Sequence, residues 1–153
     1  MGQHRFYARK AAFYDEAVRV PLLVRGPGLA GAETRHELVS LVDLAPTILE
    51  LAGATTPEVL EGRSLVPLLR GQVAPSDWRR EVFLELYNAE LNAALRTDRW
   101  SYVELSSNEY ELYDLVADPY ELQSLHRTAG PEVMGPLAAR LHELTSCRGV
   151  ACR

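Results

Sequence analysis

The stretch VFLELYNAELNAALRTDRWSYVELSSNEYELYDL, from Val82 to Leu115, decides the fold of this chain. Four runs within it, at 82–87, 93–96, 100–105 and 111–115, are rich in leucine, aromatic and other strand-compatible residues. Short polar segments separate these runs, among them Thr97-Asp98-Arg99 between the second and the third. Short adjacent strands with tight connections predict an antiparallel meander, in which each strand pairs with its neighbour along the chain.

A helix is predicted after the strands. Apolar residues recur at helical spacing there, at Val133, Leu137, Leu141 and Leu144, so one face of the helix should pack on the sheet. Pro136 falls within this stretch and is expected to kink the helix or divide it in two.

The segment before the strands has a mixed pattern. Pro21–Arg25 is a short apolar run that predicts a buried strand, and Glu37–Val42 is a second extended candidate. Asp43 is placed to cap a following helix, which Gly53 would end. A polar linker at 71–76 suggests a boundary. The residues alone therefore predict a mixed α/β or α+β fold.

Composition excludes some classes of function. The 153 residues are 47% hydrophobic and 24% charged, as in ordinary globular domains. The net charge of −5 argues against a large nucleic-acid interface, which would need a clustered basic face. No apolar run has the length of a membrane span, and the first ten residues, MGQHRFYARK, lack the apolar core of a signal peptide.

The two cysteines, Cys147 and Cys152, lie near the end of the chain with four residues between them. They could form a local disulfide in an oxidising compartment or remain two reduced thiols. A metal site would need two further ligands, and only His142 is close in sequence.

A few residues near the start could contact an anion. The Lys10 amine is a compact cation suited to phosphate or sulfate, and His4 could donate to an oxyanion. Taken singly, each is better explained as a solvated surface residue. Arg19 is spaced to pair with Asp15 on a helical turn.

Other candidates have structural explanations. Asp114 and Asp118 are predicted to form turns, since an aspartate before a proline favours one. The remaining histidines form no constellation with one another. The sequence contains no glycine-rich phosphate loop, no Gly-x-Ser-x-Gly motif, and no paired carboxylates beside a histidine at metal-ligand spacing.

Four segments together resemble the type I, formylglycine-dependent sulfatases. Phe13–Gly28 is similar to the segment that follows the metal-binding Asp-Asn-Gly motif of that family. Leu41–Thr47, Gly62–Leu65 and Glu111–Leu115, the last followed by Asp118-Pro119, resemble further family signatures in the same order. The Cys-x4-Cys-Arg tail and Gly2-Gln3-His4 resemble the N-acetylglucosamine-6-sulfatase branch.

The resemblance implies an alkaline-phosphatase-like α/β fold. Residues 1–73 would form the end of the main α/β domain. Residues 74–153 would form a C-terminal subdomain of about four antiparallel strands packed on a terminal helix. A secreted, periplasmic or lysosome-like location is implied as well.

The resemblance also implies a reaction, the hydrolysis of sulfate esters, and the expected substrates are sulfated sugars such as N-acetylglucosamine-6-sulfate. Family members use Ca²⁺ and a formylglycine made from the cysteine or serine of a Cys-x-Pro-x-Arg motif. Lys10 matches the family lysine that contacts the substrate sulfate, and His4 lies shortly after the position of the metal motif.

The catalytic set is incomplete in this chain. Neither Cys147 nor Cys152 begins a formylglycine motif, and the aspartate and asparagine ligands of calcium are absent from the 153 residues. We therefore expect the chain to be inactive alone. It would be the C-terminal portion of a sulfatase, with exposed apolar surface that favours self-association. The alternative is a standalone non-catalytic module that binds a sulfated glycan or a partner protein through Lys10 and Arg19.

Overall fold

The computed structural model describes residues 12–29, 33–87 and 91–152, which pack into two compact units. The first unit contains residues 12–22 and 83–145, and the second contains residues 23–82 and 146–152. Each unit is therefore built from two separate segments of the chain. The expected division between residues 73 and 74 stays a prediction.

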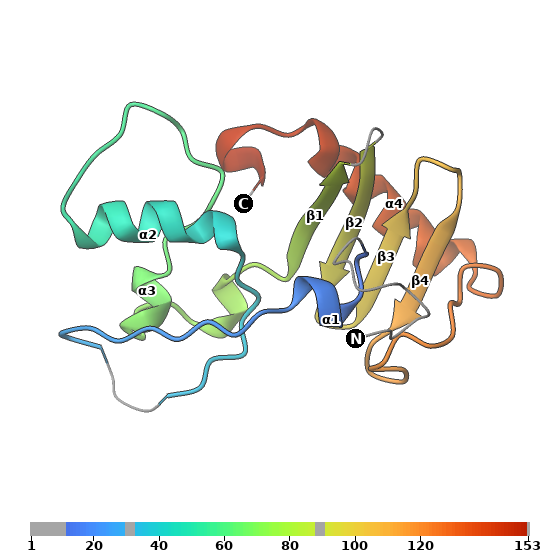
Figure 1. Cartoon of the computed structure of the whole chain (residues 1–153), viewed down its shortest axis with the longest axis horizontal. Helices are drawn as coiled ribbons and strands as arrows, with labels where there is room; N and C mark the ends of the chain where they lie inside the picture. The colour runs from blue at the N-terminus through green and yellow to red at the C-terminus, as the bar shows by residue number, and fades with distance from the viewer. Residues whose placement is uncertain (1–11, 30–32, 88–90, 153) are drawn as a thin grey trace. The chain divides into compact units, whose positions relative to one another are not determined.

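A four-stranded sheet forms the centre of the first unit (Figure 1). Its strands lie in chain order and are β1 (Glu81–Tyr87), β2 (Leu91–Thr97), β3 (Trp100–Glu104) and β4 (Tyr110–Asp114). The pairs β2–β3 and β3–β4 are antiparallel. The predicted meander is confirmed, because the strand order in the sheet is the order along the chain.

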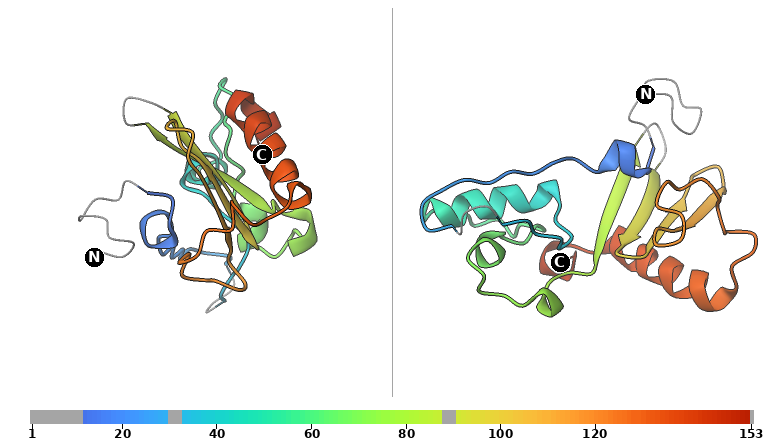
Figure 2. Two further views of the ribbon diagram at one scale, coloured as in Figure 1. Left: turned by 90° about the vertical axis from the view of Figure 1, so that its right-hand side faces the viewer. Right: turned by 90° about the horizontal axis from the view of Figure 1, so that it is seen from below.

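The two faces of this sheet carry different residues. The register aligns Leu95, Tyr102 and Leu112 in one row across β2, β3 and β4, and all three are buried. Ala94 and Val103 point to the opposite face, because successive side chains on a strand alternate. The long helix α4 (Pro131–Ser146) lies along one face and the single turn α1 (Asp15–Val18) lies on the other (Figure 2).

Contacts assign each helix to its face. His142 of α4 bonds Glu104, which shares the face of Tyr102, and Leu141 of α4 is fully buried. Phe13, just before α1, packs with Ala94 and Val103 on the other face. The predicted packing of a terminal helix on the sheet is confirmed.

Pro136 does not divide α4, so that part of the expectation was wrong. The helix runs from Pro131 to Ser146 without interruption. A proline inside a helix removes its own N–H bond and crowds the carbonyl one turn earlier, but the buried Leu141 and Leu144 on the following turns keep the helix on its partner surface.

The second unit is built from short helices. They are η2 (Leu41–Asp43), α2 (Leu44–Leu51), α3 (Val66–Leu69), η3 (Pro75–Asp77) and η4 (Gly149–Cys152). Leu65, Leu68 and Trp78 form its core, with Leu44, Leu69 and Val73 packed against them. The Trp78 indole N–H donates to the Leu38 carbonyl over 2.8 Å, so this buried polar group is satisfied.

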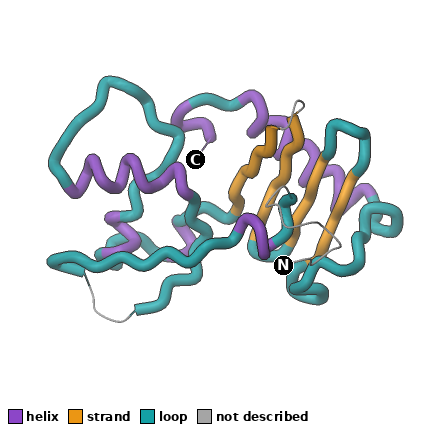
Figure 3. The backbone as a smooth tube through the Cα atoms, in the orientation of Figure 1, coloured by secondary structure: helices purple, strands orange, loops and turns teal. Residues whose placement is uncertain are grey.

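The two strands predicted before residue 43 are not formed. Pro21–Arg25 has an irregular backbone (Figure 3), and within the described ranges no strand pairs with it. A strand needs a neighbour for its backbone N–H and C=O groups, so an apolar run alone is not enough. Glu37–Val42 ends in the 3-10 turn η2 instead, because Ser40 and Asp43 form a capping box that turns the chain.

Asp43 does occupy the N-cap position of α2, but its side chain does not cap that helix. The carboxylate is used by the capping box, by the Arg63 backbone N–H and by the Arg79 guanidinium. The capping role predicted for the Asp43 side chain in α2 was therefore wrong.

Candidate functional site

The two residues that the sequence nominates for sulfate, Lys10 and His4, lie outside the described residues. The described residues begin at residue 12, and they show how the segment that follows Lys10 is anchored. That segment, residues 13–18, lies against the sheet face formed by alternate residues of β2, β3 and β4. It is built around three consecutive residues, Phe13, Tyr14 and Asp15.

Phe13 supplies an apolar anchor. Its side chain is 7% exposed and forms a buried cluster with Ala94 of β2 and Val103 of β3. Leu84, Leu86 and Leu105 pack around this cluster. Full burial of a phenylalanine side chain contributes about 1.5–3 kcal/mol, so this contact alone favours a fixed position for the segment.

Tyr14 supplies a polar anchor on the neighbouring strand. Its hydroxyl donates to Glu111 Oε1 over 3.3 Å, and the Tyr113 hydroxyl donates to Glu111 Oε2 over 3.2 Å. The two tyrosine rings meet edge to face, with centroids 6.0 Å apart. Burial is the main cause that raises the pKa of both tyrosines, and the nearby Glu111 carboxylate adds to it, so both stay neutral hydrogen-bond donors at physiological pH.

Asp15 joins the segment to two charged residues that are far away in sequence. Its backbone N–H donates to Glu121 Oε2 over 2.8 Å. Its carboxylate Oδ1 lies 2.6 Å from Arg96 Nη1, and Glu121 Oε1 lies 3.7 Å from the same nitrogen. Arg96 thus sits between two carboxylates. The predicted pair of Asp15 with Arg19 is confirmed at 3.6 Å, although Arg19 is largely exposed.

Glu121 is the most unusual member of this cluster. Its side chain is 1% exposed, and its backbone has a positive φ of 53°, which is uncommon for a residue other than glycine. Burial raises the pKa of its carboxyl above the ordinary value. The Asp15 N–H, the Ser101 hydroxyl and Arg96 act in the opposite direction. The carboxyl is therefore costly to bury and is held by several specific partners.

Arg96 and Glu121 are not among the site residues that the sequence predicts. One signal for Arg96 is alternation, since Ala94 and Arg96 share a face with Ser101 and Val103 in the observed register. A charged residue on an otherwise buried strand face usually has a partner. For Glu121, the sequence signal is the Asp118-Pro119 pair, which predicts a turn. The turn includes Glu121, whose backbone N–H donates to the Asp118 carbonyl over 3.1 Å.

The predicted turn roles of Asp114 and Asp118 are confirmed. Asp114 Oδ1 accepts the N–H groups of Val116 and Ala117, and Asp118 Oδ2 accepts the N–H of Gln123. The Arg99 guanidinium, 2.7 Å from Asp114, lowers the pKa of that carboxyl. These aspartates shape the loop that carries Glu121.

In the second unit, the Leu41–Thr47 and Gly62–Leu65 motifs meet at Asp43, which is fully buried. Its carboxylate accepts the N–H groups of Ser40 and Arg63, each over 2.8 Å, and lies 2.6 Å from Arg79 Nη2. The Thr47 hydroxyl donates to the Asp43 carbonyl over 2.5 Å and accepts the Leu65 N–H over 2.8 Å.

Two arginines of this network also stack on one aromatic ring. The Arg63 guanidinium carbon lies 4.2 Å and that of Arg79 5.6 Å from the centre of the Trp78 ring. Both carboxylate oxygens of Asp43 are engaged by backbone or arginine groups, so the arrangement explains these two motifs as structural.

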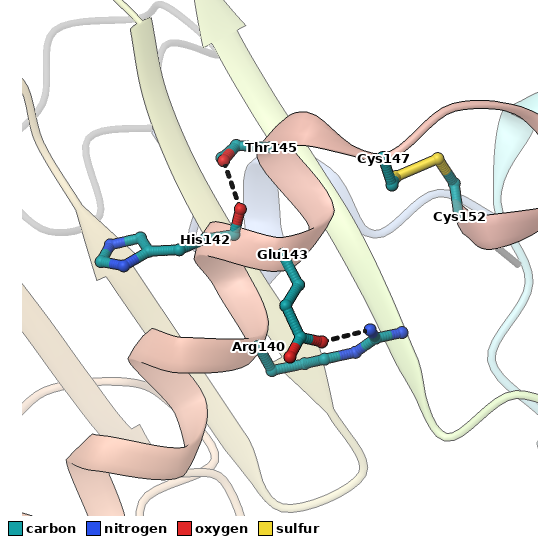
Figure 4. The surroundings of a disulfide bond; sticks show 6 residues. All are labelled: Arg140, His142, Glu143, Thr145, Cys147 and Cys152. Atoms are coloured by element: carbon teal, nitrogen blue, oxygen red, sulfur yellow. Dashed lines mark hydrogen bonds and ion pairs between the residues drawn. A yellow bond between two sulfur atoms is a disulfide. The ribbon is translucent and has the colours of Figure 1, made fainter.

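The cysteines are joined by a disulfide in the structure (Figure 4). Cys147 directly follows α4 and Cys152 ends η4, with their Cα atoms 5.4 Å apart. Gly149 between them has a positive φ of 61°, which lets the short loop turn. The neighbouring residues of α4 in Figure 4 include the ion pair of Arg140 with Glu143, 2.8 Å apart.

Across residues 12–29, 33–87 and 91–152, no group of three or more His, Cys, Asp or Glu side chains is placed to hold a metal ion. The described residues therefore do not fit a calcium site. In the same ranges, no helix combines the length and the apolar character that crossing a membrane requires.

Comparison with known proteins places these motifs in a family. The family model described as N-sulphoglucosamine sulphohydrolase, C-terminal, matches residues 2–146. N-acetylglucosamine-6-sulfatase of Bos taurus is 32% identical over 189 aligned positions, which cover 99% of this chain and 34% of the relative. The chain thus spans about a third of the length of the curated relatives it matches.

Solved structures agree with this placement. A structure described as a 2-O GAG sulfatase has a TM-score of 0.75 and 30% identity, covering 93% of this chain and 32% of that one. A phosphonate monoester hydrolase from Silicibacter pomeroyi also gives a TM-score of 0.75 and 30% identity, covering 89% and 30%. The resemblance to sulfatases and the alkaline-phosphatase-like fold are confirmed. Because the family model spans nearly the whole chain, this chain belongs to the N-sulphoglucosamine sulphohydrolase C-terminal family of the sulfatases.

Proposed function

We propose that this chain is the C-terminal part of a sulfatase that hydrolyses sulfate esters of sugars, of the N-acetylglucosamine-6-sulfate kind. Two findings support this proposal, the match to a C-terminal family model and the similarity to N-acetylglucosamine-6-sulfatase and a 2-O GAG sulfatase. The observation that carries it is the anchorage of Phe13, Tyr14 and Asp15 on the sheet, directly after Lys10.

In this proposal, the first unit provides a rigid support for the lysine that contacts sulfate. The Lys10 ammonium would donate to a sulfate oxygen and offset negative charge that builds up as the ester bond breaks. Such a contact stabilises the transition state only if the cation is held in place beforehand. His4 is proposed as a second, weaker donor to the same group.

The nucleophile and the metal are assigned to another part of the enzyme. By the family resemblance, a formylglycine would supply the nucleophile and Ca²⁺ would help to hold the sulfate in the complete enzyme. The sequence has no formylglycine motif, and the described residues do not fit a calcium site. We therefore propose that the 153 residues alone do not hydrolyse sulfate esters, and no step through either group is assigned to them.

The proposed location is secreted, periplasmic or lysosome-like. The disulfide between Cys147 and Cys152 supports this, because disulfides persist in oxidising compartments.

Activity assays test the assignment. We expect the purified 153-residue chain to show no calcium-dependent turnover of an aryl sulfate. In the full-length enzyme, we expect Lys10→Ala to reduce kcat/KM for 6-sulfated N-acetylglucosamine by about 100-fold, as removal of a single oxyanion donor does. Full activity of the Lys10→Ala enzyme, or turnover by the short chain, would contradict the proposal.

A substrate comparison separates this function from that of the phosphonate hydrolase with the same fold. The same full-length enzyme should prefer the sulfated sugar to a phosphonate monoester in kcat/KM. The opposite preference would assign the chain to phosphonate chemistry. Sulfate-dependent binding to the 153 residues, in an otherwise inactive native protein, would instead favour the standalone binding module.

A further inference from the structure

We infer that Arg96 and Glu121 are positioning residues that hold the segment carrying Lys10 through their contacts with Asp15. The inference rests on the proposed function, because it concerns the sulfate contact assigned to Lys10. Neither residue is expected to touch the substrate itself.

The contacts approach Asp15 from two different elements. Arg96 lies on β2 and contacts the Asp15 side chain at 2.6 Å. Glu121 lies in the loop after β4 and accepts the Asp15 backbone N–H at 2.8 Å. Because one contact fixes the side chain and the other fixes the backbone, together they define both the place and the orientation of the first turn of α1.

The cost of this arrangement indicates a role beyond stability. Two carboxylates and one guanidinium share a site in which Glu121 is 1% exposed and Arg96 is 17% exposed. Glu121 Oε1 and Arg96 Nη1 make no hydrogen bond of regular geometry with a protein partner among the described residues. A buried ion cluster usually gives no more stability than apolar residues of similar volume. The apolar contact needed to attach the segment is already present at Phe13.

Chain connectivity transmits the effect to Lys10. Lys10 precedes Phe13 by three residues, so their Cα atoms are separated by at most about 11 Å. A shift of the anchored residues therefore moves the attachment point of the lysine. Misplacement of a positioning group by about 1 Å can cost about 100-fold in rate.

A double-mutant cycle in the full-length enzyme tests this inference. The variants are Lys10→Ala, Arg96→Gln and the combination of the two, with kcat/KM for a 6-sulfated N-acetylglucosamine substrate as the measured quantity. The control is Arg140→Gln, which removes the Arg140–Glu143 ion pair of α4, on the opposite face of the sheet from the segment. Arg96→Lys retains the charge and should restore part of the activity.

We expect Arg96→Gln to lower kcat/KM at least about tenfold and Arg140→Gln to change it less than about twofold. In the Lys10→Ala background, Arg96→Gln should lower kcat/KM little further, since residues that act as a unit are not additive. If Lys10→Ala lowers kcat/KM but Arg96→Gln does not, or if the effects of the two substitutions simply add, the positioning role is overturned and the proposed function stands. A harmless Lys10→Ala would overturn the sulfate contact and the inference with it.

Hydrogen exchange in the 153-residue chain gives an answer that does not depend on activity. Arg96→Gln and Glu121→Gln should each speed amide exchange in residues 13–18, and Arg140→Gln should leave those amides unchanged. Unchanged exchange in the first two variants would contradict the inference, whatever the assays show.

Discussion

Glu121 combines three properties that rarely occur together: a side chain 1% exposed, a positive φ and a carboxyl whose pKa is raised by burial. The groups that face it are Asp15, Arg96 and Ser101. Glu121 therefore has a higher pKa in the folded chain than in the unfolded chain. At a pH between these two pKa values, the folded chain binds more protons than the unfolded chain. Stability attributable to Glu121 should therefore fall as pH rises through this interval.

Glu121→Gln tests this dependence on pH. We expect the free energy of unfolding of the wild-type chain, relative to the Glu121→Gln variant, to increase as pH falls toward the ordinary pKa of a glutamate carboxyl, because burial raises the pKa of Glu121 above its unfolded value. Urea unfolding of both proteins at several pH values measures the difference.

The exposed Glu143→Gln substitution on α4 is the matched control, since Glu143 is 66% exposed. A difference for Glu121→Gln that is constant with pH, or that decreases toward acid, would contradict the raised pKa.

At the scale of elements, the backbone of Gly62 lies directly against that of Val42 and Asp43. A Cβ atom at Gly62 would overlap the Val42 carbonyl oxygen, which belongs to the backbone and cannot turn aside. The two motifs Leu41–Thr47 and Gly62–Leu65 therefore approach as closely as they do because residue 62 has no side chain.

Gly62→Ala should destabilise the chain by roughly 2 kcal/mol or more, since the overlap forces a backbone shift in a packed region. Gly135→Ala is the matched control. Gly135 lies inside α4 with no atom within 4 Å of its would-be Cβ. It should be neutral or stabilise by about 0.5–1 kcal/mol. Equal effects of the two substitutions on the free energy of unfolding would contradict the close approach.

The elements differ in how far the sequence alone predicts them. The meander and α4 follow from local patterns, because their partners are neighbours in the chain and the apolar spacing is regular. The strand predicted at Pro21–Arg25 is not formed, since an apolar run does not reveal whether a strand is present to pair with it. Arg96 and Glu121 were missed because they meet only when β2 and the loop after β4 fold together. Their partner Asp15 was read correctly through its local pair with Arg19.

At the scale of the whole molecule, several large apolar side chains are exposed. Leu23 is 90% exposed, and Val20, Leu22 and Val24 around it are between 43% and 48% exposed. Leu41 and Ile48 are also mostly exposed in the second unit. Contiguous apolar residues on a surface usually mark an interaction site or a tendency to associate.

We expect the 153-residue chain to self-associate as its concentration rises, and Leu23→Lys to reduce that association. Analytical ultracentrifugation over a range of concentrations measures both. Arg19→Ala, which changes an exposed residue outside the apolar run, serves as the control and should leave association unchanged. A chain that stays monomeric at high concentration would show that this apolar run does not drive association.

We propose that these residues are the C-terminal part of a larger catalytic protein. The intact mass of the natural product in its source cells, combined with peptide mapping, tests this proposal. We expect a mass well above 17.1 kDa and an upstream peptide in which a Cys-x-Pro-x-Arg motif carries formylglycine. A native product of 17.1 kDa that begins at Met1 would contradict it.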